Sequence, residues 1–199
     1  MHNPLDRFTA ALPRPVRLLV DWFVTVAIAV GVVLALKEWV VNPYRIPSAS
    51  MEPTLHCAQP TTGCVGVRSD RVLANRFVYR FREPRRGDVV VFETPINARR
   101  LCGAGGVFVK RLIGLPGEVV SERDGVIFID GKRLEEPYIR PERRDRESGG
   151  WNVPEDGYFL LGDNRRQSCD SRRWGAVKRE ALIGPVFATY WPFDRLDLS

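Results

Sequence analysis

The stretch LLVDWFVTVAIAVGVVLAL, residues 18 to 36, divides the chain into two parts of different character. Asp21 is the one charged residue within it, and the apolar pattern continues to Val41 after a short charged interruption. About 24 residues can therefore form a single helix, whereas roughly 20 suffice to cross the core of a bilayer. The stretch predicts a transmembrane helix over residues 18–41.

Two other structures are compatible with an apolar run of this kind. A cleaved signal peptide has a shorter apolar core and a small-residue cleavage site, which Asn42-Pro43-Tyr44 does not offer. A buried helix of a soluble protein needs a large core around it, and the following residues are numerous enough to supply one. Trp22 and Trp39, near the two ends, favour the membrane interpretation, because aromatic residues collect at bilayer interfaces.

Basic residues before the apolar segment indicate its orientation. Arg7, Arg14 and Arg17 precede it, and short segments rich in arginine stay on the cytoplasmic side. We therefore expect a short cytoplasmic N-terminus over residues 1–17 and an extracytoplasmic domain over residues 42–199.

The sequence after the apolar segment has the pattern of a β protein. Short apolar runs alternate with turn residues in RVLANRFVYRF, DVVVF, VFVKRLIGL, VVSERDGVIFIDG, YFLLGDN and GPVFATYWPF. Asp124-Gly125 and Asp130-Gly131 are typical of hairpin turns, and the charged residues 140–152 predict an exposed loop. We expect a mostly β fold without a long amphipathic helix.

Composition places this domain among globular proteins and excludes one class of partner. Charged residues make up 27% of the chain and hydrophobic residues 44%, as in ordinary folded domains. The formal net charge is +6, but no zinc knuckle or aromatic-basic motif accompanies it, so no nucleic-acid partner is expected.

Four cysteines lie in the part expected outside the membrane, where thiols can oxidise. Cys57 and Cys64 flank a short loop that a disulfide could close, which would leave Cys102 and Cys169 as the other pair. Free buried thiols and a zinc site are the alternatives, although the spacings lack the paired form usual for zinc ligands.

A candidate nucleophile lies in RIPSASMEPTL, residues 45–55, soon after the apolar segment. Prolines keep this loop out of a regular helix or central strand, and it carries Ser48 and Ser50. A nucleophilic serine needs a base that accepts its proton. The histidines are His2 and His56 alone and no G-x-S-x-G motif is present, so a histidine-based triad is not expected.

Lysine is scarce in this chain, and Lys110 lies in the apolar run VFVKRLIGL. On a strand it would share one face with Phe108 and Leu112. Burial there would lower the pKa of the amine and suit it to act as a general base. The alternative is an edge-strand lysine whose amine reaches water.

A third polar stretch, LLGDNRRQSCDSRRWG, follows an apolar strand. Ser168 could orient a nearby base, and the charged side chains could form one network. These charged residues are Asp163, Arg165, Asp170 and Arg172. An ordinary turn-rich surface loop is the alternative.

Four motifs follow the apolar segment in order: PSASMEPTL at 47–55, RRGDVVVF at 85–92, VKRLIGLPGE at 109–118 and GDNRRQSCDSRRWG at 162–175. Together they resemble the motifs of bacterial type I signal peptidases, also called leader peptidases. The resemblance extends from about residue 18 to Trp191. It implies a mostly β, signal-peptidase-like fold preceded by one N-terminal transmembrane helix.

The resemblance also implies a serine protease with a Ser-Lys dyad, in which Ser50 matches the nucleophile and Lys110 the general base. The backbone N–H of Ser50 and the hydroxyl of Ser48 match the oxyanion hole. Ser168 matches the serine that orients the lysine amine. The supporting ion pairs would join Asp163 to Arg111 and Asp170 to Arg172. The apolar substrate pockets would be lined by Tyr44, Ile46, Pro47 and Val109.

The reaction and its surroundings are implied in the same way. The enzyme would remove signal peptides from exported preproteins after an Ala-x-Ala-like site, at the cell membrane, with no metal or organic cofactor. Two rival functions fit less well. A self-cleaving repressor needs an N-terminal helix-turn-helix in place of the apolar segment, and an inactive binding domain would not need the serine and lysine pair.

The chain departs from the family pattern at a few places. Ala49 stands where glycine is frequent, and Arg166 and Gln167 replace a common Asp-Asn pair. Residues 56–68 form an insertion with two cysteines. Residues 119–157 are few, so the second β domain of some relatives looks reduced to a hairpin and loop.

Overall fold

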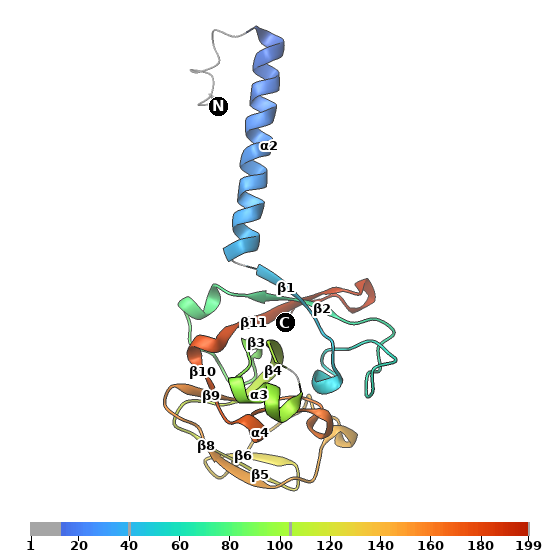
Figure 1. Ribbon diagram of the computed structural model, residues 1–199, viewed down its shortest axis with the longest axis vertical. Helices are drawn as coiled ribbons and strands as arrows, with labels where there is room; N and C mark the ends of the chain where they lie inside the picture. Colours follow the sequence, from blue (N-terminus) through green and yellow to red (C-terminus); the bar gives the residue numbers. More distant parts are fainter. Residues whose placement is uncertain (1–12, 40, 104, 199) are drawn as a thin grey trace. The chain divides into compact units, whose positions relative to one another are not determined.

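The computed structural model describes residues 13–39, 41–103 and 105–198, and Figure 1 labels its elements. Contacts divide the chain into two compact units, Met1–Val40 and Val41–Ser199. Most of the expected cytoplasmic N-terminus, residues 1–12, lies outside the described residues.

The first unit contains the helix α2, Arg14–Trp39. It begins four residues before the predicted span of 18–41, and residue 40 lies outside the described part of the chain. Large apolar side chains such as Leu18, Phe23 and Val33 are exposed along it. The stretch Arg14–Leu34 is long and apolar enough to cross a membrane. A helix suits this task because its backbone hydrogen bonds are all made internally.

The second unit is mostly β, as predicted, and its larger sheet is antiparallel throughout. The strands, in spatial order, are β1 Val41–Arg45, β2 Arg71–Asn75, β11 Leu182–Trp191, β3 Val89–Glu93, β4 Val107–Gly114, β9 Gly157–Leu161 and β10 Val177–Lys178. A further strand, β12 Asp197–Leu198, pairs with β11. Strand β4 therefore lies between β3 and β9 in the interior of the sheet.

The smaller sheet is built from the region predicted to be a reduced insertion. Its spatial order is β7 Lys132–Arg133, β6 Val126–Ile129, β5 Val119–Arg123 and β8 Gly149–Asn152. Both predicted hairpin turns are confirmed, with φ values of 49° and 75° at Asp124 and Gly125 and of 49° and 79° at Asp130 and Gly131. Positive φ at both central residues matches the twist of paired strands.

Two local predictions are wrong. The run from 71 to 81 is not one strand, because the side chain of Asn75 accepts hydrogen bonds from the N–H groups of Phe77 and Val78 and ends β2 there. The predicted loop 140–152 contains strand β8, which pairs with β5. Trp151 of β8 stacks at 5.2 Å on Phe159, and this apolar contact holds the glycine-rich strand in place.

Short helices connect the strands. The α-helical turns are α3 Ile96–Cys102 and α4 Ser171–Trp174. The 3-10 turns are η1 Ala49–Met51, η2 Val78–Arg80, η3 Pro141–Arg143, η4 Arg165–Gln167, η5 Arg179–Ala181 and η6 Phe193–Arg195. Disulfides join Cys57 to Cys64 and Cys102 to Cys169, so the predicted pairing is confirmed over the alternatives of free thiols or zinc.

Strands β4 and β9 separate two of the hydrophobic cores. Leu112 and Leu160 pack into one core, while Ile113 and Phe159 pack into the other, against the smaller sheet. Burying a side chain of this size stabilises the fold by about 2 kcal/mol. With both faces covered, β4 and β9 are rigid supports for any side chain that they carry.

Candidate active site

The structure brings Ser50 and Lys110 together across 60 positions of sequence, and Lys110 Nζ donates a hydrogen bond to Ser50 Oγ at 2.5 Å. Ser50 lies on the short turn η1, and Lys110 lies on β4, opposite Val90 of β3. The ammonium group is 5.7 Å from the ring centroid of Phe108, two residues away on the same strand face. The alternative of an edge-strand lysine that reaches water is therefore wrong.

Burial changes the acidity of this lysine. Lys110 is only 3% exposed, and loss of hydration lowers the pKa of its amine to about 8. The nearby carboxylates of Asp170 and Asp163 oppose this shift, and the guanidinium of Arg172 adds to it. A neutral amine next to a serine hydroxyl can accept its proton, as a general base must near neutral pH.

A buried carboxylate that the sequence motifs do not identify stabilises the turn that carries Ser50, called the serine turn below. Glu52 is fully buried, and its carboxylate accepts hydrogen bonds from the N–H groups of Cys57 and Val65 at 3.1 and 3.2 Å. The ring of His56 also contacts it closely through Nδ1. The insertion of residues 56–68 thus wraps around Glu52, two residues after Ser50. The one signal for this role is that Glu52 is the only charged residue in the motif PSASMEPTL, residues 47–55.

The hydroxyl of Ser48 is the second polar group beside the candidate nucleophile. Its Oγ lies 3.2 Å from Ser50 Oγ, and Ser48 is exposed whereas Ser50 is 8% exposed. A donor at this distance can reach an oxygen atom that develops negative charge next to Ser50.

The motif GDNRRQSCDSRRWG, residues 162–175, packs directly on the serine turn. The N–H of Asn164 donates to the carbonyl of Ser50 at 3.1 Å, and its side chain donates to the carbonyl of Ala49 at 3.0 Å. A Cβ atom on Gly162 would lie 2.5 Å from that Ser50 carbonyl and 2.2 Å from Ser168 Oγ. Only glycine fits between the two serines.

Ser168 lies at this contact, but its predicted hydrogen bond to Lys110 is absent. Its Oγ is buried and has no hydrogen-bond partner within the described part of the chain. The amine of Lys110 instead donates to Ser50. The orienting role of Ser168 therefore stays a prediction.

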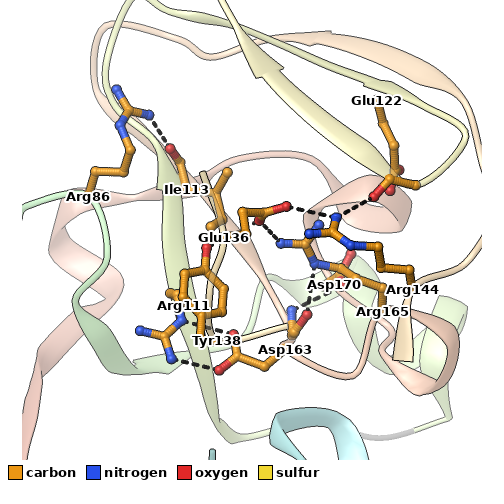
Figure 2. Close-up of polar contacts among 12 residues, drawn as sticks. Arg86, Arg111, Ile113, Glu122, Glu136, Tyr138, Arg144, Asp163, Arg165 and Asp170 are labelled. Carbon is orange, nitrogen blue, oxygen red and sulfur yellow. Dashed lines mark hydrogen bonds and ion pairs between the residues drawn. The ribbon is translucent and has the colours of Figure 1, made fainter. Parts of the chain in front are cut away.

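Both expected ion pairs are present, and Figure 2 shows the first of them. Arg111 donates to the two carboxylate oxygens of Asp163 at 2.9 and 2.7 Å, and Thr54 donates to the same carboxylate at 2.5 Å. Arg172 donates twice to Asp170, at 2.9 and 3.0 Å. Asp163 and Asp170 are fully buried, so these bonds supply the partners that buried charges require.

A cleft of about 390 Å³ opens beside Ser50 and Lys110. All four residues predicted to contact substrate line it, namely Tyr44, Ile46, Pro47 and Val109. Ser48, Ser50 and Lys110 line it as well. Its lining is mainly apolar, so it suits apolar side chains placed next to Ser50.

Arg166 and Gln167, which stand where the family commonly has an Asp-Asn pair, differ in their position relative to the cleft. Gln167 lines it, accepts a hydrogen bond from Asn164 at 2.9 Å, and abuts Gly63 of the insertion. Arg166 is exposed and does not line this cleft. The insertion is thus joined to the cleft through Gln167.

The side chains able to bind a metal ion are not grouped into a metal centre in the described residues. Across residues 13–39, 41–103 and 105–198, no three side chains of His, Cys, Asp or Glu are grouped to hold a metal ion. The carboxylates of Asp163 and Asp170, near Ser50 and Lys110, form ion pairs with arginines instead.

Comparison with known proteins gives consistent relatives. Residues 19–191 match the family model described as signal peptidase, peptidase S26. The chain is 39% identical over 174 residues to a probable signal peptidase I-2 of Synechocystis, covering 87% of this chain and 74% of the relative. It is 36% identical over 195 residues to a signal peptidase I of Leptolyngbya laminosa, covering 98% and 90%. A crystal structure of a signal peptidase I from Enterococcus faecalis matches 52% of this chain and 97% of its own, with 34% identity and a TM-score of 0.44.

Proposed function

The chain belongs to the signal peptidase family, peptidase S26, and from this premise we propose that it is a membrane-anchored endopeptidase with a Ser-Lys dyad. Ser50 is the nucleophile and Lys110 the general base. The observation that carries the proposal is the bond of 2.5 Å between a serine hydroxyl and a buried lysine amine.

The chemistry follows from the protonation of Lys110. The neutral amine takes the proton of Ser50 as Oγ attacks the carbonyl carbon of the scissile peptide bond. The hydroxyl of Ser48 and the N–H of Ser50 donate to the oxyanion that forms. The ammonium group of Lys110 then protonates the departing amine, and the peptide bond breaks to leave an ester on Ser50. Lys110 then accepts a proton from a water molecule as the water oxygen attacks the carbonyl carbon of the ester. The ammonium group returns that proton to Ser50 Oγ as the ester bond breaks, which releases the carboxylic acid product and restores both residues.

The cleft supports the proposed Ala-x-Ala specificity. Tyr44, Ile46, Pro47 and Val109 give the cleft an apolar wall beside Ser50, which is compatible with the alanine side chains expected before the cleaved bond. An extended signal peptide would pair its main chain with these segments, so that affinity does not depend on its variable side chains. The substrates are then the signal peptides of exported preproteins.

Orientation in the membrane is part of the proposal. Helix α2 spans the bilayer once, with residues 1–17 in the cytoplasm and residues 42–199 outside. Protease added to spheroplasts is expected to digest the catalytic unit and to spare a short anchor fragment, which immunoblotting would detect. Full protection of the catalytic unit until the membrane is lysed would contradict this orientation.

The proposed function is tested with the full-length chain in detergent and a precursor that carries an Ala-x-Ala site. Mass spectrometry of the products is expected to show one cut after the second alanine. A matched precursor with tryptophan in place of that alanine is expected to stay intact. An uncut Ala-x-Ala precursor, or equal cleavage of both precursors, would contradict the proposal.

A further inference from the structure

A buried carboxylate that follows strand β7 of the smaller sheet contacts the motif at residues 162–175. Glu136, just after β7, is 5% exposed. It forms a close ion pair with Arg165 of the motif, as Figure 2 shows. It also accepts hydrogen bonds from the hydroxyl of Tyr138 at 3.1 Å and from Arg144 at 3.3 Å.

The position of Arg165 depends on this carboxylate. Arg165 is 2% exposed, and among the described residues Glu136 is the only acidic side chain paired with it. Its Nε donates to the carbonyl of Gly162 at 3.0 Å. Removing one partner of a buried ion pair leaves an uncompensated charge, which is strongly destabilising. Without Glu136, the guanidinium is therefore expected to leave its place and release the Gly162 carbonyl.

Gly162 is where the contacts that run from Glu136 through Arg165 reach the Ser50–Lys110 pair. It has no room for a side chain between Ser168 and the carbonyl of Ser50. Its N–H donates to Asp170 at 3.1 Å, so both of its backbone polar groups are held. A shift of this peptide would move Ser50 relative to Lys110.

A second set of contacts runs from Glu136 through Tyr138. The guanidinium carbon of Arg111 lies 3.9 Å from the ring centroid of Tyr138, and Arg111 holds Asp163 with two hydrogen bonds. The hydroxyl of the same Tyr138 donates to Glu136. Glu136 therefore supports the motif beside Ser50 and Lys110 in two ways. One is through Arg165 on Gly162, and the other is through Tyr138 on Arg111.

We propose that Glu136 is a positioning residue for the Ser50–Lys110 pair, acting through Arg165 on Gly162 and through Tyr138 on Arg111. This inference rests on the proposed function, because its readout is precursor cleavage. It also gives the region 119–157 a role in catalysis, although Glu136 does not line the cleft.

Glu136→Gln keeps the size of the side chain but removes its charge. It is expected to lower kcat by roughly 10- to 100-fold, since misplacement of a reacting group by about 1 Å has effects of this order. KM is expected to change by less than about 3-fold, because Glu136 does not line the cleft. A purely structural role would instead reduce the amount of folded protein at unchanged kcat.

Glu147→Gln is the matched control. It makes the same carboxylate-to-amide change in the same segment, and Glu147 also pairs with an arginine of the motif, Arg173. That pair is exposed, with 50% and 62% of the two side chains accessible. Its loss is expected to leave kcat within about 2-fold of wild type, because surface ion pairs contribute little.

The double variant Glu136→Gln/Arg165→Met decides the case if Glu136→Gln alone does not fold, because it removes both buried charges together. It is expected to fold and still to have a kcat reduced by roughly 10-fold or more, since methionine cannot donate to the Gly162 carbonyl. Wild-type kcat in folded Glu136→Gln or in the folded double variant would overturn the inference. Failure of the wild-type chain to cleave the precursor would instead overturn the proposed function together with it.

Discussion

Lys110→Arg is expected to lower kcat/KM for precursor cleavage by about 10³-fold or more, a loss within the range seen when a general base is removed. Arginine keeps the positive charge and can still donate to Ser50, but it does not deprotonate in proteins. Its guanidinium is also larger than the ammonium group in a site where Lys110 is 3% exposed. Initial rates at precursor concentrations below KM, measured with Lys110→Arg and wild type at pH 9, provide the test.

Lys110→Met is the matched comparison for this variant. It removes the charge and the proton acceptor while keeping an unbranched chain in the apolar surroundings of Phe108 and Leu112. We expect Lys110→Met to be as inactive as Lys110→Arg, although it should fold at least as well because it places no charge at the buried position 110. Activity of either variant near that of wild type would show that another group accepts the proton.

Ser50→Ala is expected to reduce kcat by about 10⁴-fold or more. Catalytic residues that act together are non-additive, so removing one of them abolishes nearly all of their combined rate enhancement. The substitution deletes one oxygen atom, which is within hydrogen-bond distance of Lys110 Nζ and Ser48 Oγ. The backbone bonds from Asn164 and Glu52 to the turn do not involve this atom, so the fold should be kept. The variant should still bind precursor in a pull-down.

Ser148→Ala is the control for this prediction, since it makes the same change at an exposed serine outside the cleft. Its cleavage rate should match that of wild type. Persistent cleavage by Ser50→Ala at the same bond would assign the nucleophile to another residue.

Local sequence patterns were sufficient for the elements that depend on local physics. The apolar run predicted a helix, and it is found as α2 with a start at Arg14. The two Asp-Gly pairs predicted hairpins because positive φ is a property of those residues themselves. Asn75 shows the limit of this approach, since one side-chain contact with the following N–H groups ended a strand that apolar periodicity extended.

The candidate site was less accessible to such reasoning. Ser50 and Lys110 are 60 positions apart, and no local pattern pairs them; the order of motifs shared with a known family does. Glu52 and Glu136 were not identified, because a buried carboxylate is recognised by what surrounds it after folding. Because glutamate is mostly found at the surface, sequence neighbours alone predict that such a residue is solvent-exposed.

The dependence of kcat/KM on pH in the wild-type chain tests the Ser-Lys dyad most directly. Lys110 must be neutral to accept a proton, and burial lowers the pKa of its amine to about 8. The rate should therefore rise with pH, reach half its maximum near pH 8, and at pH 6 be about 100-fold below the plateau. Burial also raises the pKa of Glu122 to about 7, so the profile of Glu122→Gln is the control and should keep its midpoint near 8. A rate that is flat between about pH 6 and 9, or a midpoint that vanishes in Glu122→Gln, would contradict the account.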